Sequence, residues 1–597
     1  MAKTIKKTLP WFVILALIGL IGGVGLNFNF HFQNSEVHAE SATTSATVSN
    51  VVPALGATVE DPVSTGASPT DVGDAVTFKS TSNDPNGDNW YLAICTTNAV
   101  TAGTLGGAPT CNVGTWGIST TTVSGAEATA SYTALVGAAQ SNAWWAFACD
   151  AASSGQLCSA SQQGTGDSGT PFFVNHRPGF TGYQDDSPKG PATTVTWTTT
   201  ASDTDDDTAQ DTVTLYVCPT DAFTDGGSPA CTVTELCHST AVASAPTCGY
   251  TTLRPDGNDY PAYGFVVDSH GLAASGGSQG TNSVFEVSNV APSITESSIS
   301  LLNTTGSGEL ALTGEETETT GFEVVFTVVD TNSCVIKGGT VNVNNEVASA
   351  FINVRESQII QSLCNETGEY NANQCYPDAY ASWSPSCIQD AATCTDATDT
   401  SVTWTCTFPL QYHADPTVTG TPNAANDWIA AVQAEDDDAA NTGLIDGATH
   451  TNEMDTFMAY NLSTATIAYG AVAPGAYSAE KTTTVEATGN VGLDENISGG
   501  IATGEGLCTD YDTCAGSTID ALQQKHNLTA VQGWDDGSAV ALSYAGGEAE
   551  LNCAKTTTTN TPASANNYWN LRMPNPQATG SYTGQNTIEG KVDNESY

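Results

Sequence analysis

VSNVVP at Val48–Pro53 is repeated as VNHRP at Val174–Pro178 and as VSNVAP at Val287–Pro292. Successive copies lie roughly 120 residues apart, which exceeds the period of solenoid repeats and suits tandem autonomous domains of about 100 residues. The phrase therefore predicts a string of β-sandwich domains whose junctions it marks.

The first two repeats share further phrases in the same order. In each, an aspartate follows the first aromatic-containing run at the same spacing, a second run ends in cysteine, and a late run ends in aspartate. The corresponding pairs are Phe78 with Trp197, Asp84 with Asp203, Trp90–Cys95 with Val213–Cys218, and Trp145–Asp150 with Tyr263–Asp268. This shared order makes chance similarity of the junction phrases alone improbable.

A third and more divergent repeat begins at Pro292. Its early strand is predicted at Phe322–Asp330 and its late strand at Trp428–Val432, and the cysteine-rich stretch between them, at about 345–400, is interpreted as a disulfide-tied insertion. After Asn461 the phrasing changes, which predicts a different C-terminal β-rich domain.

Short runs of threonine, valine and aromatic residues alternate with glycine, proline, asparagine and aspartate along the whole chain, a pattern typical of strands joined by tight turns. The best helix signal is STIDALQQKH at Ser517–His526, where Ser517 is a suitable N-cap. The sequence thus predicts an all-β protein.

The N-terminus predicts export. Lys3, Lys6 and Lys7 precede an uncharged apolar run from Leu9 to about Leu26, which is long enough for a signal peptide or a short membrane span. Val37–Ala39 offers a signal-peptidase site, so a cleaved signal and a retained membrane anchor both remain open. Either places the rest of the chain outside the cell or on its surface.

Seventeen cysteines in an exported chain indicate an oxidising compartment. The second repeat has Val267 and Ala273 or Ala274 where the first has Cys149 and Cys158, and this joint loss predicts that those two cysteines are bonded. The other predicted pairs are Cys95 with Cys111, Cys218 with Cys231, Cys237 with Cys248, and Cys508 with Cys514. Cys553 is the candidate for the unpaired cysteine. No CxxC motif occurs in the sequence. Zinc ribbons, thioredoxin-like redox sites and c-type haem attachment sites usually carry this motif, so the sequence does not support any of the three.

The charge balance excludes one class of partner and favours one class of ion. Only 14 Lys plus Arg face 64 Asp plus Glu, giving a net charge of −50. A nucleic-acid-binding protein needs a basic footprint, which this composition does not supply. Divalent cations are the natural counter-ions, and calcium is the default outside cells because it prefers oxygen ligands.

Three acidic turns carry a family resemblance: DPNGD at Asp84–Asp88, DTDDD at Asp203–Asp207 and DSHGL at Asp268–Leu272. With their adjoining strands they resemble the bacterial and archaeal immunoglobulin-like superfamily, especially its PKD-like and cadherin-like surface repeats, over roughly residues 48–460. The resemblance implies spacers, adhesins or envelope components, many of which bind calcium between or within modules. It leaves the C-terminal portion without a match.

The expected architecture is a series of tandem immunoglobulin-like β-sandwiches, followed by a distinct C-terminal β-rich domain and preceded by an N-terminal hydrophobic helix. The expected divisions are a signal peptide or membrane anchor at 1–39, a linker at 40–50, immunoglobulin-like domains at 51–175, 176–290 and 291–462, and the C-terminal domain at 463–597.

Asp84, Asp88, Asp203, Asp205 and Asp207 are the candidate calcium ligands, because hard carboxylate oxygens crowd together in these turns. A solvated acidic turn is the alternative. The spacing does not fit an EF-hand loop, which needs a ligand at every second position, a central glycine and a terminal glutamate.

Trp144 and Trp145 are candidate carbohydrate-binding residues, because strand alternation directs one of two adjacent rings outward. Packing in the sandwich core is the alternative. Catalysis is not expected: the eight histidines are scattered, and acids in turns lack the fixed cleft that glycoside hydrolysis needs.

The sequence therefore predicts a structural or adhesive protein of the cell envelope whose partners are other surface proteins or glycans. Two alternatives stay open: a carbohydrate-binding surface protein, and a self-assembling surface-layer or filament subunit.

Overall fold

The computed structural model describes residues 46–164, 169–206, 211–303, 310–312, 321–339, 345–364, 371, 373–377, 385–447, 451–511, 513–557 and 561–593. The predicted N-terminal hydrophobic helix and the predicted signal-peptidase site at Val37–Ala39 lie outside these residues. Within them the regular elements are β-strands and three short 3₁₀ turns. The described part of the chain contains no helix long and apolar enough to cross a membrane.

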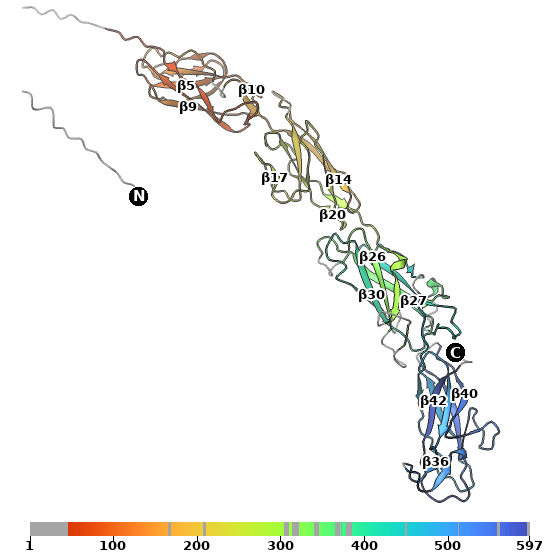
Figure 1. The fold of residues 1–597 in the computed structure, drawn as a ribbon. Coiled ribbons are helices and arrows are strands. Elements are labelled where there is room, and N and C mark those ends of the chain that lie inside the picture. Colours follow the sequence, from red (N-terminus) through yellow and green to blue (C-terminus); the bar gives the residue numbers. More distant parts are fainter. Residues whose placement is uncertain are drawn as a thin grey trace, which may run out of the picture.

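The described strands form four β-rich units that follow one another along the chain (Figure 1). We refer to residues 54–175, 179–287, 293–446 and 460–592 as units 1 to 4. Every sheet of the described residues lies within one unit, and the main hydrophobic clusters divide in the same way, except that Leu272 of unit 2 belongs to the cluster of unit 1. The molecule is therefore an elongated series of separate cores rather than one large core.

Unit 1 packs two sheets face to face. Val76 and Phe78 on one sheet and Leu92 and Ile94 on the other point into the same cluster, and the alternating burial along β4 agrees with this packing. The first sheet contains β1 (Ala54–Leu55), β2 (Val59–Asp61), β4 (Ala75–Asn83) and β9 (Glu127–Thr133), and the second contains β5 (Trp90–Cys95), β8 (Thr115–Ile118) and β11 (Trp145–Asp150). A third sheet joins β3 (Thr70–Asp71), β10 (Ser141–Asn142) and β12 (Phe172–Asn175).

Unit 2 repeats the central pairing of unit 1 in the same register. Asp150 pairs with Trp90 at the end of the β5–β11 ladder, and Asp268 pairs with Val213 at the corresponding position. Its sheets contain β13 (Gly179–Asp185), β14 (Thr194–Ser202) and β19 (Cys248–Thr251), then β15 (Val213–Cys218), β18 (Cys237–His238), β21 (Tyr263–Asp268) and β22 (Thr281–Asn282); the small sheets are β16 (Phe223–Thr224) with β17 (Ala230–Cys231) and β20 (Gly257–Tyr260) with β23 (Phe285–Val287).

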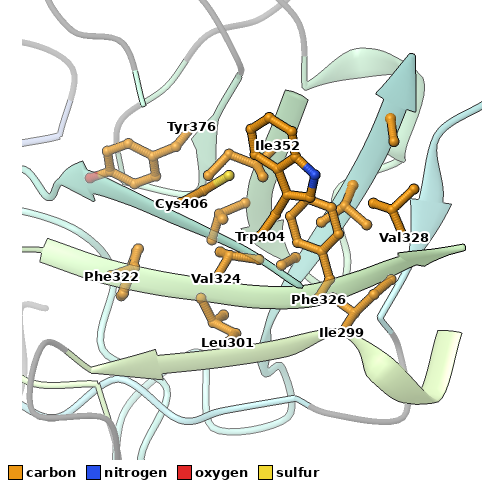
Figure 2. Packing of buried hydrophobic residues seen from close by; sticks show 14 of the residues in the cluster. Ile299, Leu301, Phe322, Val324, Phe326, Val328, Ile352, Tyr376, Trp404 and Cys406 are labelled. Carbon is orange, nitrogen blue, oxygen red and sulfur yellow. The ribbon is translucent and has the colours of Figure 1, made fainter. Parts of the chain in front are cut away.

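Unit 3 has the largest cluster, in which Phe322, Val324 and Phe326 of one strand lie beside Trp404 and Cys406 of its neighbour (Figure 2). Its sheets contain β24 (Ser293–Ile294), β25 (Ser300–Asn303), β26 (Gly321–Val329), β29 (Ser386–Gln389) and β30 (Ser401–Pro409), then β27 (Val347–Glu356), β28 (Cys375–Tyr376), β31 (Trp428–Asp436) and β32 (Ile445–Asp446).

The stretch at about 345–400 is more than the insertion that the sequence suggests. Its first part is β27, which pairs with β31 along its whole length and contributes Ile352 and Val354 to the core. The sequence of this strand lacks a regular alternation of apolar and polar residues, so it gives a weak strand signal, and the insertion interpretation is wrong for residues 347–356.

Unit 4 is built from a five-stranded and a three-stranded sheet. The first contains β33 (Tyr460–Leu462), β34 (Lys481–Ala487), β38 (Gln524–Asn527), β39 (Val540–Ala541) and β41 (Ala563–Leu571); the second contains β35 (Leu493–Gly499), β40 (Gly547–Cys553) and β42 (Asn586–Val592); β36 (Glu505–Cys508) pairs with β37 (Thr518–Asp520). Its buried apolar residues form two smaller clusters.

The helix predicted at Ser517–His526 is wrong. The structure has β37, a single 3₁₀ turn at Ala521–Gln523 and β38 in its place, and Asp520 rather than Ser517 caps the turn by accepting a hydrogen bond from Leu522 N. β38 pairs with β41, and this long-range pairing overrides a weak local helix preference.

Eight disulfides are formed, and each of them lies within a single unit. Five are the pairs expected from the sequence: Cys95–Cys111, Cys149–Cys158, Cys218–Cys231, Cys237–Cys248 and Cys508–Cys514. The other three lie in unit 3, at Cys334–Cys394, Cys364–Cys375 and Cys387–Cys406. So many disulfides in one chain are typical of an extracellular or surface protein.

Cys553 is the free cysteine among the described residues, and it is buried with 1% exposure. Burial raises the pKa of its thiol to about 11. We expect a thiol reagent to leave the folded, non-reduced chain unmodified and to label one thiol per chain after denaturation, counted by mass spectrometry. Labelling before denaturation, or of more than one thiol, would contradict this pairing.

Candidate cation sites at the unit junctions

The asparagine of each junction phrase is tied to the unit that follows it. Asn50 Nδ2 donates to Asp150 Oδ2 at 2.8 Å, Asn175 Nδ2 to Asp268 Oδ2 at 3.0 Å, and Asn289 Nδ2 to Asp436 Oδ2 at 3.1 Å. In all three units the acceptor is the last residue of the late strand, β11, β21 or β31. The junction asparagine therefore holds the incoming chain against the base of the next unit.

The residue after that asparagine makes a second repeated contact. The backbone N–H of Val51 donates to Asn86 Oδ1, that of His176 to Asp205 Oδ2, and that of Val290 to Asn332 Oδ1, at 2.6–2.7 Å. Each acceptor residue in turn donates its own N–H to an aspartate two positions earlier. These aspartates are Asp84, Asp203 and Asp330, and the distances to their Oδ1 atoms are 2.7, 2.9 and 2.8 Å.

Two oxygen atoms remain buried at each of these three junctions without a protein hydrogen-bond donor among the described residues. They are the Oδ1 atom of the asparagine (Asn50, Asn175 or Asn289) and the Oδ2 atom of the aspartate (Asp84, Asp203 or Asp330). The three aspartates are only 6%, 3% and 1% exposed. A buried oxygen without a partner costs about 1–3 kcal/mol, more for a charged group, so the threefold repetition makes each of these three places a candidate ligand site.

The junction of units 1 and 2 has the densest acidic cluster of the predicted turns. One carboxylate oxygen each of Asp203, Asp205 and Asp211 lies within 4.8 Å of the others. Burial, together with the charges of Asp205, Asp268 and Asp211, raises the pKa of Asp203 to about 6. Burial also raises the pKa of Asp268. His176 Nδ1 lies 3.0 Å from Asp205 Oδ1, and His270 Nε2 lies 3.5 Å from Asp211 Oδ1.

The donor set of this cluster fits a hard divalent cation. It offers three carboxylate oxygens, the kind of ligand that calcium takes in sets of six to eight, and the described residues bring no cysteine sulfur to it. Asp203, Asp205 and Asp211 are the residues that would hold the ion. Its charge would offset the mutual repulsion of the buried carboxylates.

Direct packing reinforces the same junction. Leu272, in the turn after β21 of unit 2, is buried within the hydrophobic cluster of unit 1. Asn175 Nδ2 also donates to Asp71 Oδ1 of unit 1 at 2.8 Å, and Asp206 N donates to Gln140 Oε1 at 2.9 Å. These contacts connect the acidic cluster to both neighbouring units.

The junction of units 3 and 4 is built differently. Thr488 and Asn490 occupy the places of the aspartate and its partner, and Asn490 Oδ1 accepts from Phe457 N at 2.6 Å. The buried cation here is Lys555 of unit 4, whose Nζ pairs with Asp415 and donates to His413 O at 3.1 Å. The chain thus supplies its own ammonium group at this junction.

The predicted metal ligands divide into three groups. Asp203 and Asp205 lie in one cluster, as the sequence suggests. Asp84 belongs to the first junction, but Asp88 contributes its backbone N–H, at 3.3 Å from Asp84 Oδ1, and neither belongs to a cluster of three acids among the described residues. Asp207 lies outside the described residues.

The sequence analysis did not identify the residues that lie against the acidic turns at each junction. The three junction asparagines, Asp330, and the late-strand residues Asp150, Asp268 and Asp436 were not among the candidate ligands. Alignment of the repeats carries the signal, since each of these residues recurs at a matching place in all three units. Asp211 lies two residues before Val213, as Asp88 lies two residues before Trp90, so the same alignment of the repeats indicates it.

Trp144 is not an aromatic platform for sugars. Its ring is fully buried against Phe78, and its Nε1 donates to Glu60 Oε1 at 2.9 Å. Trp145 is half-buried and packs on the cluster around the Cys95–Cys111 disulfide. The ring that alternation turns away from the main core is therefore used in a second cluster, and the carbohydrate-binding hypothesis for Trp144 is wrong.

Comparisons with known proteins leave the chain without a family. No protein-family model matches it, and no curated protein matches it. Among solved structures it is similar to a marsupial T cell receptor (10% identity, 63% of this chain and 96% of that chain, TM-score 0.25) and to the Yersinia pseudotuberculosis adhesin InvE (15% identity, 44% and 71%, TM-score 0.16). A third is the chaperone–tip adhesin complex of CFA/I fimbriae (10% identity, 52% and 92%, TM-score 0.19). These TM-scores are too low to support a functional argument, so the function is argued from the junctions.

Proposed function

We propose that this chain is an extracellular structural or adhesive protein of the cell envelope, built of immunoglobulin-like units of the PKD-like and cadherin-like kind and stiffened by calcium at its junctions. The observation that carries the proposal is the junction arrangement repeated at Asn50, Asn175 and Asn289, each with two buried oxygens that lack a protein donor. Because this arrangement recurs where the chain enters each of three units, we assign it the role of fixing the orientation of each unit relative to the chain before it.

The proposed units follow the boundaries 51–175, 176–290 and 291–462, with a different C-terminal domain at 463–597. Residues 1–39 would serve as the export signal or anchor. Eight disulfides support the extracellular location, because they persist outside the reducing cytoplasm. The net charge of −50 supports a requirement for divalent counter-ions.

The mechanism is mechanical. A flexible linker between two domains permits reorientation unless contacts at the junction restrict it. Here the asparagine side chain and the next backbone N–H fix the linker to two separate turns of the following unit. An ion held by Asp203, Asp205 and Asp211 would fix those turns to each other, so that the units project as a rod. The role is non-enzymatic, and other surface proteins or glycans are the proposed partners.

Immunogold electron microscopy of whole cells tests the proposed location and role. We expect label outside the cytoplasmic membrane, in a pattern set by a rod that spaces or attaches the surface, and reduced attachment or a disrupted surface in a deletion strain. A cytoplasmic label would contradict the proposal. A regular lattice or fibre pattern would select the surface-layer or filament form of the structural role over scattered adhesins.

A further inference from the structure

A second acidic cluster lies between units 2 and 3. Glu346 precedes β27 of unit 3, and Asp437 follows β31 of the same unit. Asp437 N donates to Glu346 O at 2.9 Å, which fixes the two backbones together. Asp256 comes from unit 2, in the loop before β20. One carboxylate oxygen of each of the three lies within 4.8 Å of the other two, so the cluster draws ligands from both units.

Glu346 is the unusual member of this cluster. It is fully buried, at 0% exposure, and neither of its carboxylate oxygens has a protein hydrogen-bond donor among the described residues. A buried carboxylate without a partner is among the costliest groups a protein can contain. Its position beside two further carboxylates makes a purely packing role untenable.

The basic groups nearby are used elsewhere. Lys337 of unit 3 pairs with Asp259 of unit 2, and its ammonium group lies 3.8 Å from the centroid of the Tyr260 ring. Arg254 donates to Thr331 O at 3.4 Å. Among the described residues, no ion pair joins a Lys, Arg or His side chain to Asp256, Glu346 or Asp437.

Further negative charge surrounds the cluster. Burial, with Asp256, Asp437 and Asp330 nearby, raises the pKa of Glu346 to about 10. Burial raises the pKa of Asp330 to about 7, and the charges of Asp436, Asp256 and Asp437 contribute. The charge of Asp256 raises the pKa of Asp438. At neutral pH the Glu346 carboxyl therefore needs either a bound proton or a bound cation.

We propose that Asp256, Glu346 and Asp437 form a divalent cation site that bridges units 2 and 3, in addition to the junction site at Asn289 and Asp330. The inference rests on the proposed calcium-stiffened function and adds an ion that neither the acidic turns nor the junction phrase indicates. Three carboxylates and no nitrogen or sulfur ligand select calcium over zinc. Because Asp256 belongs to the preceding unit, binding at this site couples ion occupancy directly to the contact between units.

Glu346→Gln is the decisive variant. Calcium bound per chain is measured by equilibrium dialysis with elemental analysis, on the full chain first stripped with EDTA. We expect the variant to bind one calcium ion fewer than the wild type, because the amide removes the buried charge but keeps the shape. Asp256→Asn, half-buried on the other unit, is expected to lose the same ion and covers the case in which Glu346→Gln does not fold. Glu323→Gln on β26 is the matched control and keeps the full count.

A thermal melt separates cation binding from proton sharing. In EDTA we expect Glu346→Gln to melt above the wild type because repulsion is relieved, and in calcium we expect it to melt below. The same increase in both conditions, with an unchanged ion count, would show that protons neutralise the cluster and would overturn the inference. If Asp203→Asn loses an ion but Glu346→Gln does not, the inference fails while calcium stiffening stands. If the wild type binds no calcium, both fail.

Discussion

Replacing Lys555 with methionine is expected to lower the free energy of unfolding at the junction of units 3 and 4 by about 3 kcal/mol, the lower end of the range for breaking a buried ion pair. The Lys555 and Asp415 side chains are only 8% and 7% exposed. Methionine fills the space of the lysine stem but leaves Asp415 buried without its cation. Gln374 and Asn423 donate to Asp415 at 3.1 and 2.8 Å, and these neutral donors do not replace the ammonium charge.

The loss should depend on pH in a defined direction. Burial, with the charge of Asp415 beside it, raises the pKa of Glu356 to about 8. A carboxyl whose pKa is raised on folding favours the folded state fully below its unfolded pKa, and this contribution is lost as the pH rises through the folded pKa. The deficit of Lys555→Met should therefore be largest at pH 8 and above. It should shrink as the pH falls toward about 4.5 and Glu356 takes up a proton.

Hydrogen exchange with mass spectrometry measures the effect locally, in peptides from β31 and β34, because global unfolding of a multi-unit chain is not two-state. Lys591→Met is the matched control. Its partner is Glu548, both side chains are about half exposed, and surface pairs of this kind contribute about 0–1 kcal/mol. The double variant Lys555→Met with Asp415→Asn should recover much of the loss. A Lys555→Met effect no larger than that of Lys591→Met would show that the ion pair does not hold the junction.

The sequence predicts the strands and most of the disulfides because these depend on local or repeated patterns. β4 and β14 alternate buried and exposed residues at the period of a strand, and their equivalent positions are visible in both repeats. Cys149 and Cys158 are replaced together in unit 2, so their pairing needs no knowledge of the fold. In unit 3 the repeat is too divergent for such a comparison, and there neither the three disulfides nor β27 could be assigned.

The sequence predicts the acidic turns of the junction sites but not the residues that lie against them. An acidic turn such as Asp203–Asp207 is visible in the sequence as a local concentration of charge, whereas its partners come from distant parts of the chain. The late-strand aspartate Asp268 reaches Asn175 across 93 residues, and the corresponding separations in the other units are 100 and 147 residues. Trp144 is a second example. Strand alternation predicts that the side chains of two adjacent tryptophans lie on opposite faces, but it does not predict which of the two faces the main core.

Removing calcium is expected to lower the melting temperature of unit 2 by about 11–22 °C. An ion at a free concentration about 100 times its dissociation constant stabilises the folded state by about 2.7 kcal/mol, and each kcal/mol moves the midpoint of a 100-residue domain by about 4–8 °C. The measurement is differential scanning calorimetry of the full chain in about 1 mM calcium and in EDTA, conditions that suit the micromolar affinities of many oxygen-ligand sites.

The double variant Asp203→Asn with Asp205→Asn should abolish this difference for unit 2. It is expected to fold, because asparagine already occupies the position of Asp205 in the other units, as Asn86 and Asn332, and makes the same contact to the linker. Asp396→Asn is the matched control, since Asp396 caps an equivalent turn through Thr398 N but is exposed and belongs to no acidic cluster among the described residues. This control should retain the full calcium response.

In EDTA the double variant should be more stable than the wild type, whereas in calcium the wild type should be the more stable of the two. Burial and the neighbouring carboxylates raise the pKa of Asp203 to about 6, so its ionised form destabilises the folded state at neutral pH when no cation is bound. In EDTA the wild type should therefore gain stability as the pH falls from 7 through 6, whereas the double variant should melt higher than the wild type at pH 7 and lack this gain. Calcium and protons compete for the same oxygens, so the stabilisation by calcium should weaken over the same pH range. Identical wild-type melts with and without chelator would refute calcium stiffening at this junction and leave protons and the nearby histidines His176 and His270 to neutralise the cluster.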